Sequence, residues 1–213
     1  MRLEVVSDVV CPWCFIGKRN MDIALAELAQ EGIEFEVGFR PYRLNPDLPP
    51  EGADRQEYML SKFGSAARIK EIHDRVEVAG RAAGIEFRFD LIKRSPNTLA
   101  AHHLLALAAQ AGCQPAVKEA LMSAYFTQGR DIGAPKVLAE IAEAHGIDPA
   151  GLNDADLRQQ VAESAETARQ AGISGVPSFL MNSYFLFSGA MPPDALAENF
   201  RKARAVLIER GEG

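Results

Sequence analysis

A pair of cysteines stands where a short apolar segment near the start of the chain gives way to a helical pattern. Residues 3–10 are rich in valine and predict a buried strand, and the next four residues are Cys11-Pro12-Trp13-Cys14 (the CPWC motif). Apolar residues then recur at helical spacing over residues 15–30. A chain that begins in this way must place both cysteines at a strand-to-helix junction.

The next segment completes a β-α-β unit. Gly32 is typical of a helix C-terminus, and residues 33–39 alternate apolar and polar side chains with the period of two of a half-buried strand. Strand, helix and strand in this order predict parallel pairing of the two strands.

A long helical block follows a proline-rich loop over residues 40–52. Asp54 and Glu57 have capping-box spacing and open the block, and residues 84–89 form a short extended break within it. The expected helices cover residues 54–83 (as one helix or two), 96–111, 115–127, 135–145 and 153–171.

The period changes again near the end of the chain. Residues 178–181 and 184–187 are short apolar runs around a two-residue turn, which predicts a hairpin, and residues 194–210 predict an amphipathic helix. The order predicts an α/β fold of the thioredoxin type, β-α-β followed by β-β-α, with a large all-helical insertion. We assign residues 1–40 and 172–213 to the thioredoxin-like domain and 54–171 to the insertion, which is too long for a loop.

Composition limits the partners and the compartment. The net charge of −6, with no basic cluster, argues against binding nucleic acid. No signal peptide is evident, and no window approaches the roughly 18 uninterrupted apolar residues that a membrane helix needs. Three cysteines do not suit a disulfide framework. We therefore expect a cytoplasmic protein with no membrane partner.

The CPWC motif can perform thiol–disulfide chemistry. If the helix begins near Pro12, Cys11 lies at its N-terminus, where free amides and the helix dipole favour a thiolate. Pro12 suits the first turn, where its missing N–H costs nothing. Cys14 lies one turn later, within reach of Cys11 and less exposed, which suits the thiol that resolves a mixed disulfide.

Two other readings of the cysteine pair are weaker. A structural zinc site needs four ligands, and the remaining candidates, Cys113 and four histidines, contain no second close pair of cysteines. We therefore expect no metal. A structural disulfide across two residues is unexpected in a reducing compartment.

A second element of the candidate site is the segment around Val176 and Pro177, directly before a predicted strand. The local sequence by itself favours an ordinary trans peptide bond before Pro177. Combined with the CPWC motif, this proline becomes a candidate for a cis peptide bond. Its ring would then pack beside the sulfur atoms. The backbone of Val176 would be free to pair with an extended substrate or with glutathione.

Several motifs together resemble one superfamily. They are Ser7-Asp8-x-x-Cys11-Pro12-Trp13-Cys14-Phe15-x-Gly17, the helical insertion, Pro96-Asn97-Thr98, Gly175-Val176-Pro177-Ser178-Phe179 and the C-terminal helix. The chain resembles the DsbA-like superfamily over nearly its whole length, in particular the FrnE-like branch, which is related to 2-hydroxychromene-2-carboxylate isomerases and kappa-class glutathione transferases. The resemblance implies dithiol oxidase or disulfide isomerase chemistry, with Cys11 attacking and Cys14 resolving.

Differences between this chain and these related families narrow the activity that we expect. The isomerase and transferase branches carry a serine at the position of Cys11 and an acidic residue near residues 187–191, which this chain lacks. Trp13 occupies the position at which periplasmic DsbA enzymes carry a histidine, so we expect a less stabilised thiolate and a less oxidising couple.

We expect mainly structural roles for several other residues. Cys113 is expected to be a small buried hydrophobe, with a further redox thiol as the alternative, and His102 and His103 are expected to be packing or surface residues. Asp8 is expected to cap the strand end or the helix start, with tuning of the cysteine pKa values as the alternative. We expect an N-cap at Asn97 or Thr98. The expected core phenylalanines are Phe39, Phe63 and Phe126.

The sequence thus predicts a thiol–disulfide oxidoreductase that uses the CPWC motif on protein or small-molecule thiols and disulfides. Pro12, Trp13, Val176 and Pro177 would bind substrate. No cofactor is expected to be bound, with glutathione as a co-substrate. The alternatives are a glutathione-dependent isomerase or transferase and a non-catalytic interaction module or holdase.

Overall fold

The computed structural model of the chain describes residues 1–212. Its strands are β1 (Arg2–Ser7), β2 (Glu36–Pro41), β3 (Ala53–Asp54), β4 (Arg94–Ser95), β5 (Ser178–Met181) and β6 (Tyr184–Ser188). Its α-helices are α1 (Pro12–Gln30), α2 (Arg55–Phe63), α3 (Ala66–Ala82), α4 (Leu99–Gln110), α5 (Gln114–Phe126), α6 (Pro135–Ala144), α7 (Ala155–Gln170) and α8 (Pro193–Glu209). Two short 3₁₀ helices cover Phe89–Leu91 and Pro149–Asn153.

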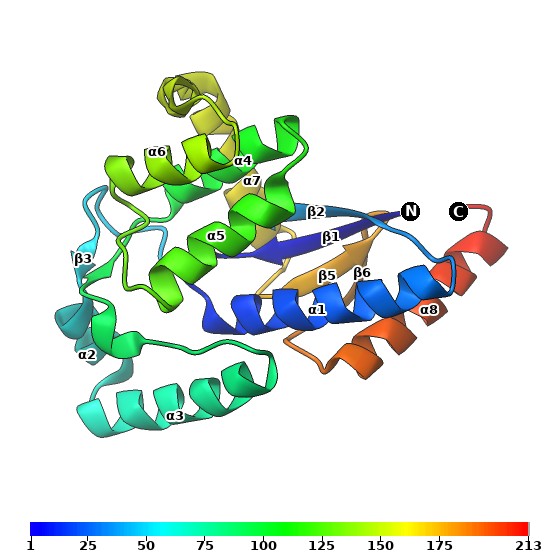
Figure 1. The fold of residues 1–213 in the computed structure, drawn as a ribbon, viewed down its shortest axis with the longest axis horizontal. Helices are drawn as coiled ribbons and strands as arrows, with labels where there is room; N and C mark the ends of the chain where they lie inside the picture. Colours follow the sequence, from blue (N-terminus) through cyan, green and yellow to red (C-terminus); the bar gives the residue numbers. More distant parts are fainter. Residues whose placement is uncertain (213) are drawn as a thin grey trace.

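A four-stranded mixed sheet with the order β2-β1-β5-β6 forms the centre of the fold (Figure 1). β1 pairs in parallel with β2 and antiparallel with β5, and β5 pairs antiparallel with β6. Asn182 and Ser183 both have positive φ in the turn of the β5–β6 hairpin, as a two-residue type I′ turn requires. The predicted β-α-β and β-β-α units and the hairpin are therefore confirmed.

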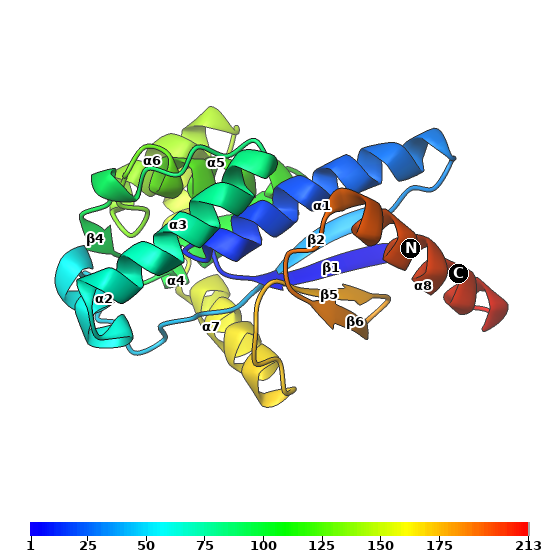
Figure 2. The same cartoon turned by 90° about the horizontal axis from the view of Figure 1, so that it is seen from below.

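Helices cover both faces of the sheet (Figure 2). α1 and α8 lie side by side on one face and bury an apolar cluster that includes Leu3, Leu28, Phe179 and Phe200. α7 lies on the other face, where Ala168 packs with side chains from β1 and β5. Because both faces of β5 are covered, all four of its residues are buried.

The helices α2 to α6 gather at the end of the sheet where β1 runs into α1 (Figures 1 and 2). Their core includes Phe87, Phe126 and Leu104, and Phe15 of α1 packs into the same cluster. The ring centroids of Phe15 and Phe126 lie 6.1 Å apart in a stacked arrangement. The first turn of α1 is thereby held against the helical block.

Most differences from the predicted elements lie at their ends. The predicted helix 54–83 is two helices, because the chain turns at Gly64, which has a positive φ of 86°. β1 ends at Ser7 rather than residue 10, because residues 8–10 form a turn closed by a 3.3 Å hydrogen bond from the Cys11 N–H to the Asp8 carbonyl.

Three further differences concern the start of α4, an additional strand pair and the burial of Phe63. α4 begins at Leu99, not at residue 96, and the two-residue pairing of β3 with β4 was not predicted. Phe39 and Phe126 are buried as expected, whereas Phe63, at the end of α2, is only half-buried.

The bounds of the two predicted domains stay a prediction. Within residues 1–212, no helix is long and apolar enough to cross a membrane.

Candidate active site

The CPWC motif lies at the junction of β1 and α1, with Cys11 as the N-cap residue and Pro12 in the first turn. The backbone N–H of Cys14 donates to the Cys11 Sγ over 3.3 Å. An N-cap sulfur that accepts from a free helix amide is positioned where negative charge is favoured. This is the predicted placement of the cysteine pair.

The loop before β5 brings Pro177 to the same place. The Val176–Pro177 peptide bond is cis, as predicted, and the Cys11 thiol donates to the Val176 carbonyl over 3.7 Å. A methyl group at Gly17 of α1 would lie 3.0 Å from the Pro177 ring, so the glycine permits the close approach of the loop. Residues separated by more than 160 positions thus form one site.

The two cysteines differ little in exposure. Cys11 is 4% exposed and Cys14 is 2% exposed, so Cys14 is the less exposed of the two, as predicted, but both side chains are buried. Cys11 is buried because the Val176 loop covers it. Trp13 is 40% exposed, Pro12 and Val176 are half-buried, and Pro177 is buried. Of the predicted substrate-binding residues, Trp13 is therefore the most accessible.

Asp8 lies fully buried behind the motif and does not cap α1, in contrast to the prediction. One carboxylate oxygen accepts from the Leu44 N–H at 2.8 Å, and the other lies 3.1 Å from His102 Nε2, which is also 3.0 Å from the Tyr42 carbonyl. Both neighbours of Nε2 are acceptors, so this nitrogen carries the proton. The carboxylate connects the CPWC turn to the loop after β2 and to α4.

The environment sets the charge state of this pair. Burial acts to raise the pKa of Asp8, but the hydrogen bond and charge of His102, the Leu44 amide and Lys118 together bring it below its ordinary value. Burial lowers the pKa of His102, and Asp8 opposes this only in part. The favoured state is a carboxylate that accepts from a neutral imidazole.

A buried lysine stands beside the same turn. Lys118 of α5 is 1% exposed, and its Nζ donates to Ser7 Oγ over 2.8 Å. Burial lowers the pKa of Lys118 to about 8. Burial also raises the pKa of the Cys14 thiol well above its ordinary value, helped by the hydrogen bond and charge of Cys11, while the charge of Lys118 acts to lower it.

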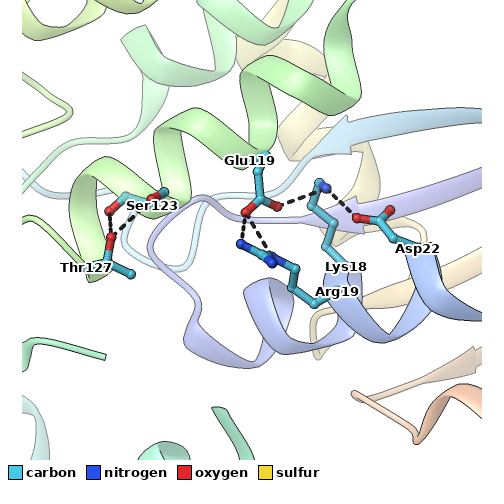
Figure 3. Close-up of polar contacts among 6 residues, drawn as sticks. All are labelled: Lys18, Arg19, Asp22, Glu119, Ser123 and Thr127. Atoms are coloured by element: carbon cyan, nitrogen blue, oxygen red, sulfur yellow. Dashed lines mark hydrogen bonds and ion pairs between the residues drawn. The ribbon is translucent and has the colours of Figure 1, made fainter. Parts of the chain in front are cut away.

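An ion-pair cluster holds α5 against α1 near this lysine (Figure 3). Glu119 lies 2.6 Å from Arg19 and 3.0 Å from Lys18, and Lys18 is also 2.7 Å from Asp22. Figure 3 shows both cations of α1 pointing toward the carboxylate on α5. The cluster thus ties α1 to α5, the helix that carries Lys118.

The remaining candidates lie outside the site. Cys113 is half-buried at the start of α5, with its Sγ 4.0 Å from the His145 carbonyl. Thr98 is the N-cap of α4, but its side chain makes no capping bond; Asn97 Oδ1 accepts from the Leu99 N–H instead. His103 is buried without a hydrogen-bond partner for either ring nitrogen.

The sequence reasoning missed Lys118 and the role of His102. A lysine at an otherwise apolar position of a predicted helix was the only local signal for the first. The residues described contain no group of three or more histidines, cysteines or carboxylates that could hold a metal ion.

Comparison with known proteins decides the family. The profile of the DSBA-like thioredoxin domain matches residues 2–201 of the chain. The chain belongs to this DSBA-like family. The predicted resemblance is thereby confirmed at the level of the family, and assignment to the FrnE-like branch stays a prediction.

Three known proteins are similar to the chain at low sequence identity. The probable DsbA oxidoreductase SCO1869 of Streptomyces coelicolor is 28% identical, with a TM-score of 0.84 over 96% of this chain and 90% of its own. The uncharacterized protein YwbO of Bacillus subtilis is 26% identical over 85% of this chain and 86% of its own. The cytosolic disulfide reductase DsbM of Pseudomonas aeruginosa, solved with glutathione, is 17% identical with a TM-score of 0.67, covering 96% of this chain and 100% of DsbM, which shows the shared fold.

Proposed function

We propose that this DSBA-like chain is a thiol–disulfide oxidoreductase that works through Cys11 and Cys14. The observation that carries the proposal is the position of the Cys11 sulfur, which caps α1 and faces the backbone of Val176 beside the cis proline. A helix N-terminus favours the thiolate form of a cysteine, and the thiolate is the nucleophile in disulfide exchange.

The reaction proceeds in two exchanges. The Cys11 thiolate attacks one sulfur of a substrate disulfide, so that a mixed disulfide forms and the first substrate thiolate leaves. The Cys14 thiolate then attacks the Cys11 sulfur, which forms the Cys11–Cys14 disulfide and releases the second substrate thiolate. Two electrons pass from the dithiol to the substrate, and the reverse sequence oxidises a substrate dithiol.

The surroundings of the motif support an extended thiol or disulfide substrate. Val176 presents a peptide group beside the attacking sulfur, and Trp13 presents a partly exposed apolar surface next to Cys11 in the chain. Backbone pairing with Val176 and contact with the indole would hold a peptide or a small thiol in place. We extend this proposal to glutathione as a co-substrate. A calorimetric titration of the oxidised protein with glutathione tests this extension.

We infer that the protein works in a reducing compartment, and we propose that this compartment is the cytoplasm. The small, odd number of cysteines supports this inference, because disulfide frameworks belong to oxidising compartments.

Insulin reduction by dithiothreitol tests the proposed function. The wild-type chain should accelerate precipitation of the insulin B chain, and Cys11→Ser should abolish the acceleration because the thiol that attacks the substrate disulfide is lost. Cys113→Ser is the matched control and should keep the activity, since this thiol lies outside the site. Equal rates for wild type and Cys11→Ser would contradict the proposal.

A further inference from the structure

Lys118 is a buried cation without an ion-pair partner. Its Nζ donates to a hydroxyl group, Ser7 Oγ, and it makes no ion pair within residues 1–212. The second buried lysine, Lys18, differs because two carboxylates, those of Asp22 and Glu119, lie within 3.0 Å of its Nζ. An ammonium group buried without such compensation loses its proton readily.

The groups that face Lys118 come from several elements. Burial lowers the pKa of Lys118, the charges of Cys14, Asp8 and Cys11 act to raise it, and the charge of Lys18 acts to lower it. The charge of Lys118 in turn acts to lower the pKa of His102 of α4. The Phe39 ring of β2 lies 5.5 Å from Nζ. The amine thus lies buried between the Phe39 ring and Ser7, the last residue of β1, close enough to the CPWC motif for its charge to act on Cys14.

Cys14 must lose a proton before it can resolve a mixed disulfide. Its side chain is 2% exposed, and burial disfavours its thiolate. A buried thiol therefore needs a proton acceptor within the protein. Asp8 is poorly suited to this role, because its carboxylate already accepts from Leu44 and His102 and both contacts favour its ionised form.

We propose that Lys118 exchanges a proton with Cys14 in the resolving step, an inference that rests on the proposed function. The neutral amine accepts the Cys14 proton, and the resulting thiolate attacks the Cys11 sulfur of the mixed disulfide. The Cys11–Cys14 bond forms as the bond from Cys11 to the substrate sulfur breaks, and the substrate leaves as a thiolate. When the disulfide is reduced again, the ammonium returns the proton to Cys14.

Exchange with one equivalent of dithiobisnitrobenzoate separates the two steps. All variants carry Cys113→Ser so that only the CPWC thiols react. The first nitrothiobenzoate released reports attack by Cys11, and the second reports resolution by Cys14. In the wild type we expect the rate of the second phase to rise with pH through a midpoint near the Lys118 pKa of about 8.

Substitutions at position 118 should slow the second phase more than the first. Lys118→Met removes the acceptor and should slow resolution at least about tenfold near pH 8. Lys118→Arg keeps the positive charge but cannot accept a proton in this range, so it should be slow as well. Lys70→Met, at an exposed lysine of α3 that pairs with Asp74, is the control and should resolve within about twofold of the wild type, because this lysine lies outside the site.

Two further measurements guard against a merely structural effect. Thermal unfolding checks that the Lys118 variants are folded. Ser7→Ala removes the hydrogen bond that favours the ammonium, so the pH midpoint of the second phase should move to lower pH. An unmoved midpoint would contradict the inference.

The outcomes separate this inference from the proposed function. Resolution by Lys118→Met at the wild-type rate and pH profile would overturn the role of Lys118 alone. A wild-type rate of the second phase in Lys118→Arg would mean that the positive charge at position 118, and not proton exchange, accelerates resolution. Absence of any second phase in the wild type would instead contradict the proposed function.

Discussion

Asp8 and His102 illustrate what single residues do behind the CPWC motif. A carboxylate that is fully buried is tolerated only when its oxygens are hydrogen-bonded, and here His102 and the Leu44 amide supply those bonds. The same contacts attach α4 and the loop after β2 to the turn that carries Cys11. One buried acid thereby holds three separate segments at the candidate site.

The titration of His102 predicts a pH dependence of stability. The pKa of His102 is lowered in the folded chain from 6.5, so the unfolded chain binds the extra proton first as the pH falls. Its contribution is complete above pH 6.5 and is lost below. Between pH 7 and pH 5, the wild type should lose up to about 2 kcal/mol more unfolding free energy than His102→Gln, which keeps a donor at this position.

Urea unfolding at a series of pH values measures this difference. The matched control is His145→Gln, a histidine outside the site, which should keep the slope of the wild type. Identical slopes for the wild type and His102→Gln would show that His102 does not titrate on unfolding.

At the scale of elements, the outer edge of β2 is closed by a side chain. The Phe39 N–H donates to Gln114 Oε1 at 2.8 Å, and Gln114 Nε2 donates back to the Phe39 carbonyl at 3.0 Å and to the Leu105 carbonyl at 3.1 Å. The glutamine amide thus pairs with the edge strand as a neighbouring strand would. This satisfies backbone groups that are otherwise unpaired at a sheet edge.

Removing this amide should destabilise the fold. Gln114→Ala leaves the buried N–H and C=O of Phe39 without partners, which should cost roughly 2–3 kcal/mol of unfolding free energy. Gln159→Ala, on the exposed surface of α7, is the control and should change stability by less than about 0.5 kcal/mol. Chemical denaturation compares the two; equal small effects would mean that the edge of β2 is satisfied in another way.

At the scale of the whole molecule, α1 belongs to two apolar cores. Its first turn contributes Phe15 to the core of the helical block, and its later turns contribute Met21 and Leu28 to the core between the sheet and α8. A rigid helix shared by two cores couples them, so we expect the sheet and the helical block to unfold together in one transition.

A substitution in the shared helix should therefore destabilise both parts. Phe15→Ala removes a 1% exposed ring that packs on Phe87 and Phe126 and should cost about 3–5 kcal/mol. Ile23→Ala, an exposed position on the same helix, should stay within about 0.5 kcal/mol of the wild type. Circular dichroism and fluorescence of Trp13 should report the same midpoint, and separate midpoints would contradict the coupling.

Local periodicity and short motifs were enough to predict several features of the fold and of the candidate site. The order of the helices and of the four strands of the main sheet, the hairpin turn at Asn182-Ser183 and the position of the CPWC motif at a helix start follow from patterns within a few residues of one another. The cis Val176–Pro177 bond was predictable only by combining two distant motifs. The family resemblance rested on the same residues and was confirmed over residues 2–201.

Only the tertiary structure decided which distant side chains meet behind the motif. Asp8 faces His102 across 94 positions of sequence, and Lys118 reaches Ser7 across 111. No periodicity encodes such pairs, because a lysine or a histidine on a helix has the same local pattern whether it is solvated or buried. Packing of the helical block against the end of β1 withdraws these groups from water, and that desolvation lowers the pKa values of His102 and Lys118.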